Sequence, residues 1–221
     1  MPARGLAPDA GAAARLTAAA PVAWFRLAVG GGALGVLGWA YGLRIAAGDA
    51  SPIDFFGYFT NLTTLLAATL LLTTGALSLG GFTSPRALIT ARAVGVTCLL
   101  AVGAVYNVLV PGTGSAPPWV SAALHVVVPL IVLADWVCVG DRPALPWRML
   151  WVVLPHPVVW LAIVLARGVA DGWVPYGFLL PSRGAASLAL HVAGLLAALL
   201  AAGALVWALS RGRGVLLRRG A

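Results

Sequence analysis

Residues 55–79, FFGYFTNLTTLLAATLLLTTGALSL, form a long apolar stretch that contains no charged side chain. A helix of about 20 apolar residues can cross the hydrocarbon core of a bilayer, so this stretch predicts a membrane-spanning helix. Further stretches of similar length and character lie at residues 22–44, 91–110, 119–139, 147–166 and 185–209. Glycine- and proline-rich turns separate several of them, such as PGTGSAPP at 111–118. The stretches are continuously apolar and do not alternate, which favours six helices over a β-barrel.

The composition excludes most classes of soluble protein. Hydrophobic residues make up 61% of the 221 residues and charged residues only 9%, with a mean hydropathy of +0.98. A soluble domain has about 25% charged residues. The chain is too hydrophobic to be disordered, and its two cysteines are too few for a disulfide scaffold. We therefore expect an all-α polytopic membrane bundle of six helices at residues 21–210, with a mobile cytoplasmic leader at 1–20 and a basic cytoplasmic tail at 211–221.

The distribution of arginine along the chain predicts its orientation. The net charge of +8 comes from 14 arginines against six aspartates, without any lysine. Three arginines fall on one side of the predicted spans: Arg44, Arg167 and Arg183. The other eleven fall on the opposite side: Arg4, Arg15, Arg26, Arg86, Arg92, Arg142, Arg148, Arg211, Arg213, Arg218 and Arg219. Because arginine-rich segments tend to stay inside, we predict a multi-pass protein of the cell membrane with both termini in the cytoplasm, in contact with membrane lipids and not with nucleic acid.

A small set of polar side chains falls within the predicted spans at a similar depth. Polar groups in the hydrocarbon core are costly and are functional candidates for that reason. At 1.5 Å per residue, the members of this set lie within about 10 Å of the predicted outer ends of their helices. The set consists of Thr60, Asn61, Asn107, His125 and His191, with Asp54 at its mouth. The asparagines and histidines could instead bond a neighbouring helix, whereas Thr63 and Thr64 are expected to bond a carbonyl of their own helix.

Two further polar residues have structural interpretations. Asp135 lies near the cytoplasmic end of the fourth span, where an unpaired charge is expensive, so we expect a structural ion pair with Arg26, Arg92 or Arg148. His156 stands between two prolines, and this pattern predicts a helix kink before it predicts catalysis. The two cysteines lie on different spans without a CxxC spacing, so neither a metal site nor a disulfide is expected.

Three short motifs resemble a known family. They are GYFTNL at 57–62, LHVVVPL at 124–130 followed by Asp135-Trp136, and WVPYGFL at 173–179. In this order they are similar to those of bacterial six-span integral membrane proteins related to the androgen-induced protein family, over about residues 55–180. Eukaryotic members of that family hydrolyse fatty acid esters of hydroxy fatty acids with an intramembrane threonine and a histidine. The resemblance implies Thr60 as the threonine and His125 as the histidine, and the chain departs from the bacterial pattern at Leu180, where an acidic residue is expected.

Three hypotheses for function follow. The first is an intramembrane hydrolase of lipid esters, in which His125 takes a proton from Thr60 and Asn61 or Asn107 stabilises the oxyanion. Asp54 is the only carboxylate near enough to orient the histidine. The second is a non-catalytic membrane regulator or a transporter. The third is a cytochrome with haem held by His125 and His191, whereas the first two need no cofactor. The oligomeric state stays open.

Overall fold

The computed structural model of the chain describes residues 19–112 and 116–214, and within them every regular element is helical. The elements are α1 (Ala20–Ala46), α2 (Pro52–Gly57), α3 (Phe59–Leu79), α4 (Arg86–Leu109), α5 (Pro118–Ala122), the π-turn η1 (Ala123–Val127), α6 (Val128–Cys138), the 3₁₀ turn η2 (Trp147–Val153), α7 (Pro155–Ala170), the short turns η3 (Gly177–Leu179) and η4 (Pro181–Arg183), and α8 (Ala185–Leu209). Six of the helical segments are long and apolar enough to cross a membrane, which confirms the expected six-span architecture. Most of the predicted leader and tail, at 1–18 and 215–221, lies outside the described residues.

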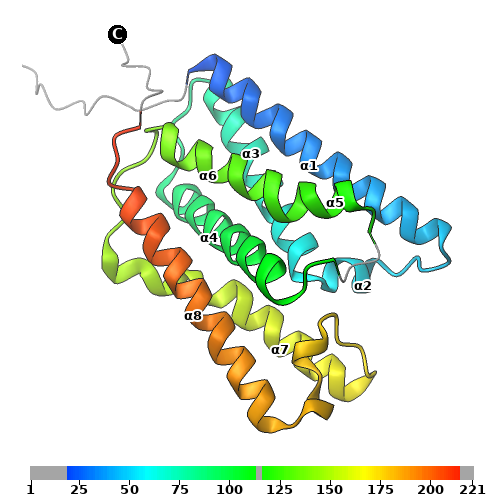
Figure 1. Cartoon of the computed structure of the whole chain (residues 1–221). Helices are drawn as coiled ribbons and strands as arrows, with labels where there is room; N and C mark the ends of the chain where they lie inside the picture. Colours follow the sequence, from blue (N-terminus) through cyan, green and yellow to red (C-terminus); the bar gives the residue numbers. More distant parts are fainter. Residues whose placement is uncertain (1–18, 113–115, 215–221) are drawn as a thin grey trace, which may run out of the picture.

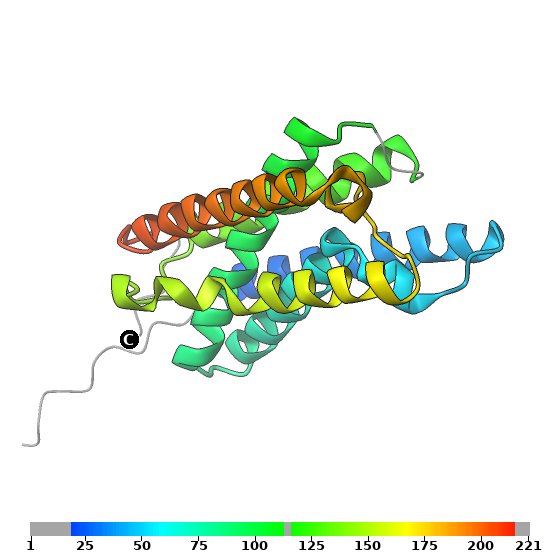
Figure 2. The same cartoon turned by 90° about the horizontal axis from the view of Figure 1, so that it is seen from below.

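The spanning helices are arranged around α4, which contacts α3, α6 and α8 (Figure 1). Helix α1 packs along α3 at one edge of the bundle, and α7 lies at another edge. Figure 2 looks onto α7 and α8 and shows that both run along the length of the bundle. Helix α1 begins and α8 ends at the same end, which we call the terminal end. The opposite end carries α2 and the loop between α7 and α8.

The second predicted span is two helices instead of one. Tyr58 is extended, with φ −70° and ψ 125°, and this residue separates α2 from α3. The short α2 begins at Pro52 and is capped by the Ser51 hydroxyl, which accepts from the Asp54 amide at 3.2 Å. The break leaves the first backbone N–H groups of α3 without helical partners. Thr60 lies in this first turn, so the break decides the surroundings of the candidate nucleophile.

The fifth span also changes direction, at the prolines. Residues 147–153 form a 3₁₀ turn, and the α-helical part begins at Pro155. Proline is tolerated in the first turn of a helix because its missing N–H would have no helical partner there. The expected kink therefore appears as a boundary between two helix types, one residue before His156.

The tightest crossing of the bundle joins α1 to α3. A side chain on Gly30 would lie 2.9 Å from Leu72 Cγ, and one on Gly75 would lie 2.9 Å from the Ala23 carbonyl oxygen. Four other glycines of α1 take no part in this crossing. They are exposed, and a Cβ at any of them would have no atom of another residue within 4 Å: Gly31, Gly35, Gly38 and Gly42.

Four buried charges tie three helices together at the terminal end. Arg26 donates to Asp135 at 2.8 Å and to Asp141 at 2.6 Å. Arg92 donates to the same carboxylates at 2.8 and 3.1 Å. The four side chains come from α1, α4, α6 and the loop after α6, and their charges sum to zero. Of the arginines expected to pair with Asp135, Arg26 and Arg92 do so, whereas the ion pairs of the described residues give Arg148 no such contact.

A third arginine, Arg142, lies beside this network in the loop after α6. Arg142 stacks on the Trp136 ring at 4.4 Å and donates to the carbonyls of Val139 and Leu209. Burial, with the nearby positive charge of Arg92, lowers the pKa of Arg142 to about 10. Burial also acts to raise the pKa of Asp141, but the two guanidinium groups outweigh it and hold that pKa below its ordinary value. The loop carboxylate is therefore charged at neutral pH and neutralises the arginines.

Asp135→Asn should destabilise the fold strongly. The substitution preserves the size of the side chain but leaves fully buried Arg26 with one carboxylate fewer. Removing one partner of a buried ion pair typically costs about 3–5 kcal/mol. We expect a large fall in the thermal unfolding temperature of the detergent-purified protein. Asp49→Asn, which breaks an exposed ion pair with Arg44, is the matched control and should unfold near the parent temperature. Equal unfolding temperatures for the two variants would contradict this account.

Candidate functional site

His125 is placed by a local widening of the fourth span. Pro129 has no N–H, so it cannot close the α-helical bond to the His125 carbonyl one turn earlier. The chain forms a π-turn at this point, in which the Val128 amide donates to the Ala123 carbonyl. Such single π-turns are frequent at functional sites. Opposite the turn, Gly103 of α4 allows close approach, because a side chain there would lie 3.0 Å from the His125 carbonyl oxygen.

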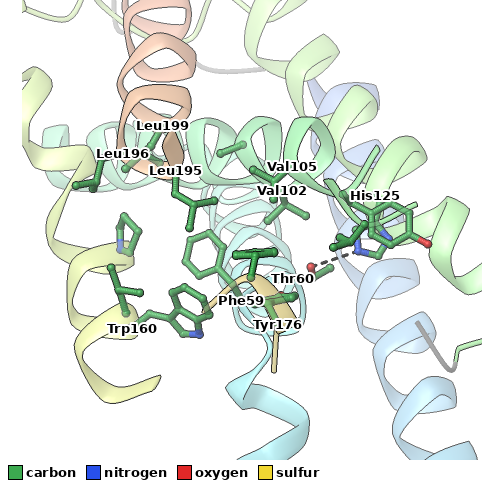
Figure 3. Close-up of a pocket in the computed structure, with 16 residues that line it drawn as sticks. Phe59, Thr60, Val102, Val105, His125, Trp160, Tyr176, Leu195, Leu196 and Leu199 are labelled. Carbon is green, nitrogen blue, oxygen red and sulfur yellow. Dashed lines mark hydrogen bonds between the residues drawn. The ribbon is translucent and has the colours of Figure 1, made fainter. Parts of the chain in front are cut away.

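Thr60 and His125 form a hydrogen-bonded pair. Thr60 Oγ1 lies 3.3 Å from His125 Nε2 (Figure 3). The other ring nitrogen, Nδ1, lies 2.8 Å from the Ser121 carbonyl oxygen. A carbonyl can only accept, so Nδ1 carries the proton and the Nε2 of the neutral ring is an acceptor. The Thr60 hydroxyl therefore donates to His125, which is the arrangement that a general base requires.

Aromatic stacking fixes the plane of the histidine. The ring of Tyr106 on α4 lies 3.6 Å from the His125 ring, with an angle of 11° between their planes. The Tyr106 hydroxyl accepts from the Gly112 amide at 3.2 Å. The stack and the Ser121 hydrogen bond together hold the imidazole with Nε2 toward Thr60.

The pair faces a cavity of about 90 Å³ enclosed by apolar side chains. Hydroxyl and imidazole groups enter its lining from Thr60, Tyr106, His125 and Tyr176. Its remaining lining includes Phe59 of α3, Trp160 of α7 and a leucine row of α8, as Figure 3 shows: Leu195, Leu196 and Leu199. A cavity that combines an apolar wall with a few convergent polar groups is typical of a site for a hydrophobic ligand.

Tyr176 also belongs to this site, although no role for it was predicted from the sequence. It lies in the loop between α7 and α8, within the motif WVPYGFL, and returns to the first turn of α3 (Figure 3). Its side chain lies beside Thr60 in the lining of the cavity. Burial raises the pKa of Tyr176, so the phenol keeps its proton at neutral pH. The motif WVPYGFL was a sequence signal for Tyr176. The path of the loop that brings this residue to α3 cannot be predicted from the spacing of residues.

The other predicted members of the site have partners elsewhere. Asn61 donates to the Phe55 carbonyl at 2.8 Å and thereby joins α3 to α2. Asn107 donates to the Gly103 carbonyl of its own helix. His191 Nδ1 lies 2.8 Å from the Ser187 carbonyl, and the residue does not line the cavity that His125 faces. Of the polar residues predicted to share one depth, Thr60 and His125 are therefore the two that meet at this cavity.

Asp54 does not orient the histidine. Its carboxylate lies 2.8 Å from Arg167 Nη1, and Arg167 also binds Asp171 at 2.8 Å and stacks on the Trp173 ring. The group that orients His125 is the Ser121 carbonyl instead. The Ser121 carbonyl can reach the ring because Ser121 lies four positions before His125, and residues four positions apart lie on the same face of a helix.

A second threonine–histidine pair lies one turn deeper on α3. Thr63 Oγ1 is 3.5 Å from His156 Nε2, so the expected bond of Thr63 to its own helix is wrong. Thr64 Oγ1, also expected to bond its own helix, is buried without a hydrogen-bond partner among the described residues. His156 lines a separate cavity of about 500 Å³ between α2, α3 and α7. Trp160 lines both cavities and donates to the Gly57 carbonyl at 2.8 Å, so it forms part of the wall between them.

Comparison with known proteins adds no family assignment. No family model, curated protein or solved structure matches the chain. The resemblance carried by the three sequence motifs therefore stays a prediction.

Proposed function

We propose that this protein is an intramembrane threonine hydrolase of lipid esters, with Thr60 as nucleophile and His125 as general base. The observation that carries the proposal is the hydrogen bond of 3.3 Å between Thr60 Oγ1 and His125 Nε2 at the wall of an apolar cavity. A threonine hydroxyl is a weak nucleophile by itself and needs a base within hydrogen-bond reach. The neutral ring, protonated on Nδ1, offers that base.

The reaction proceeds in two halves. His125 Nε2 takes the Thr60 proton while Oγ1 bonds to the ester carbonyl carbon, and the imidazolium then gives that proton to the departing alkoxide. The first product is an alcohol, and the acyl group stays on Thr60. In the second half, His125 takes a proton from water, the hydroxide attacks the acyl carbon, and the proton returns to Thr60 Oγ1. The acyl group leaves as a carboxylic acid.

The histidine works without a carboxylate partner. A carboxylate stabilises the imidazolium that forms during such a reaction and fixes its tautomer. The Ser121 carbonyl fixes the tautomer by the same geometry but contributes only a dipole. Burying a carboxylate in the membrane would require a further partner for its charge. The neutral arrangement is therefore suited to hydrocarbon surroundings and implies a weaker base than a full triad provides.

The surroundings of α7 favour a substrate that arrives from the lipid. Only 17% of the spanning window of this helix is buried inside the protein, and cavities lie along two of its sides. Val159 and Ile163 are exposed on the helix. With both termini in the cytoplasm, as the arginine distribution predicts, the dyad lies in the outer half of the membrane. A lipid ester could then enter sideways with its apolar chain in the cavity.

The alternative functions have less support. A transporter of ions usually needs ionisable groups spread through the membrane, whereas four of the buried charges of this bundle pair with one another at the terminal end. For a haem, His125 would have to offer Nε2 to iron, but that nitrogen faces Thr60. His191 does not line the same cavity.

Thr60→Ala and His125→Ala should each abolish most ester hydrolysis. Loss of the nucleophile removes the acyl-enzyme route, and loss of a general base typically costs about 10²–10⁴-fold in rate. The measurement is the turnover of a fluorogenic long-chain ester by protein purified in detergent and reconstituted into nanodiscs. Thr69→Ala is the matched control, because this exposed threonine of α3 bonds only its own helix. Parent-like turnover by either site variant would end the hydrolase proposal.

Gly103→Val should lower the turnover of the same ester by displacing the π-turn. The new side chain would meet the His125 carbonyl oxygen, from which a Cβ would be only 3.0 Å away, and would move Nε2 from Thr60. Misplacement of reacting groups by about 1 Å can reduce a rate about 10²-fold. Gly38→Ala, on an exposed face of α1 with open space around it, is the control and should be neutral. If Gly103→Val hydrolyses the ester as fast as the control, the close approach of α4 has no part in positioning His125.

A further inference from the structure

Tyr176 contributes a phenol hydroxyl to the residues around the cavity that Thr60 and His125 line. Formation of the ester intermediate places a negative charge on the carbonyl oxygen, and donors held in advance for that charge contribute strongly to the rate. The asparagines that the sequence offered for this role bond to Phe55 and Gly103 instead. Tyr176 lines the same cavity as Thr60 and His125 and lies beside Thr60 (Figure 3).

Surrounding rings fix the direction of this phenol. The Phe178 ring is stacked on Tyr176 at 5.3 Å with an angle of 6° between the planes. Trp160 packs against it edge to face at 5.9 Å, and Trp160 is itself anchored to the Gly57 carbonyl. Tyr58 packs against it edge to face at 5.8 Å. Because these contacts involve the ring, they would persist without the hydroxyl group, so the structural and chemical roles of the residue can be separated.

The first turn of α3 has backbone amides that can polarise the phenol of Tyr176. The earliest backbone bond into this helix runs from the Leu62 amide to the Tyr58 carbonyl, so the amides before Leu62 have no partner within the helix. Tyr176 lies beside this turn, in the lining that it shares with Phe59 and Thr60 (Figure 3). An N–H group that donates to a phenol oxygen makes the O–H of that phenol a stronger donor. The first turn of α3 thus offers such amides next to Tyr176.

We infer that Tyr176 is a catalytic residue whose O–H donates to the ester carbonyl oxygen as negative charge develops there. The inference rests on the proposed hydrolase function. In the resting enzyme the phenol contacts Thr60, and on substrate binding it exchanges this contact for the carbonyl oxygen. The hydrogen bond strengthens as the Thr60 Oγ1–carbon bond forms and weakens again when the alkoxide leaves. Tyr176 keeps its proton throughout, so the proton transfers of His125 and the overall hydrolysis stay balanced.

The experiment compares Tyr176→Phe with the parent on a matched pair of substrates, a fluorogenic oxygen ester and its thiono analogue, in which sulfur replaces the carbonyl oxygen. Sulfur accepts hydrogen bonds poorly, so loss of a donor penalises the oxygen ester more. For the oxygen ester we expect kcat to fall about 10²–10³-fold, the magnitude known for loss of one oxyanion donor. KM should change little, and the thiono ester should lose much less. The initial burst of alcohol product counts the competent active sites, so partial misfolding does not affect kcat.

Tyr41→Phe is the matched control. It removes a phenol that donates to the Ala50 carbonyl at 2.7 Å, away from the cavity, and should retain parent kinetics. Equal losses on both substrates by Tyr176→Phe would show a purely structural role and overturn the inference. Parent-like kcat with an inactive Thr60→Ala variant would overturn it as well and leave the hydrolase intact. Activity that survives in Thr60→Ala itself would instead remove the proposed function.

Discussion

Charge neutralisation in a medium without water is the constraint on which the bundle depends. Arg26 and Arg92 are almost completely buried, and Asp135 and Asp141 contact both of them. Each charge alone would be prohibitively expensive in the hydrocarbon region. The network therefore requires α1, α4 and α6 to meet at the terminal end. Since α3 packs on α1, and α5 continues through η1 into α6, this junction also determines where Thr60 and His125 lie at the other end.

The same constraint shapes the candidate site by different means. Its polar groups are neutral: Thr60 bonds to His125, His125 bonds to the Ser121 carbonyl, and Tyr176 lies beside Thr60. Among the residues that the structure describes, none of the carboxylates contacts this group, and Asp54 is instead paired with Arg167 near the end of α7. The charged side chains thus pair with one another, whereas the polar groups at the cavity are hydroxyl, imidazole and backbone groups. This division allows chemistry in an apolar cavity without a permanent buried charge.

Packing also differs across the bundle. The α1–α3 crossing is so close that Gly30 and Gly75 leave no space for a side chain. Helix α7, in contrast, has cavities along two of its sides, with Trp160 in the wall between them. Cavities reduce stability because the atoms that line them lose contacts. A loosely packed helix beside a polar pair is where a lipid could reach the interior, whereas the tight crossing maintains the frame.

The sequence by itself determined the six spans, because a bilayer requires about 20 apolar residues for each and few charges interrupt them. It also placed Thr60 and His125 at one depth, since the rise of a helix is fixed. Rotation and neighbour order are not encoded in hydropathy, so Asn61, Asn107 and Asp54 were grouped with a site that they do not join. Only the tertiary structure decided the break at Tyr58, the pairing of Thr63 with His156, and the return of Tyr176 to α3. These features depend on which helix faces meet and where a loop runs, and both are set by packing between distant segments.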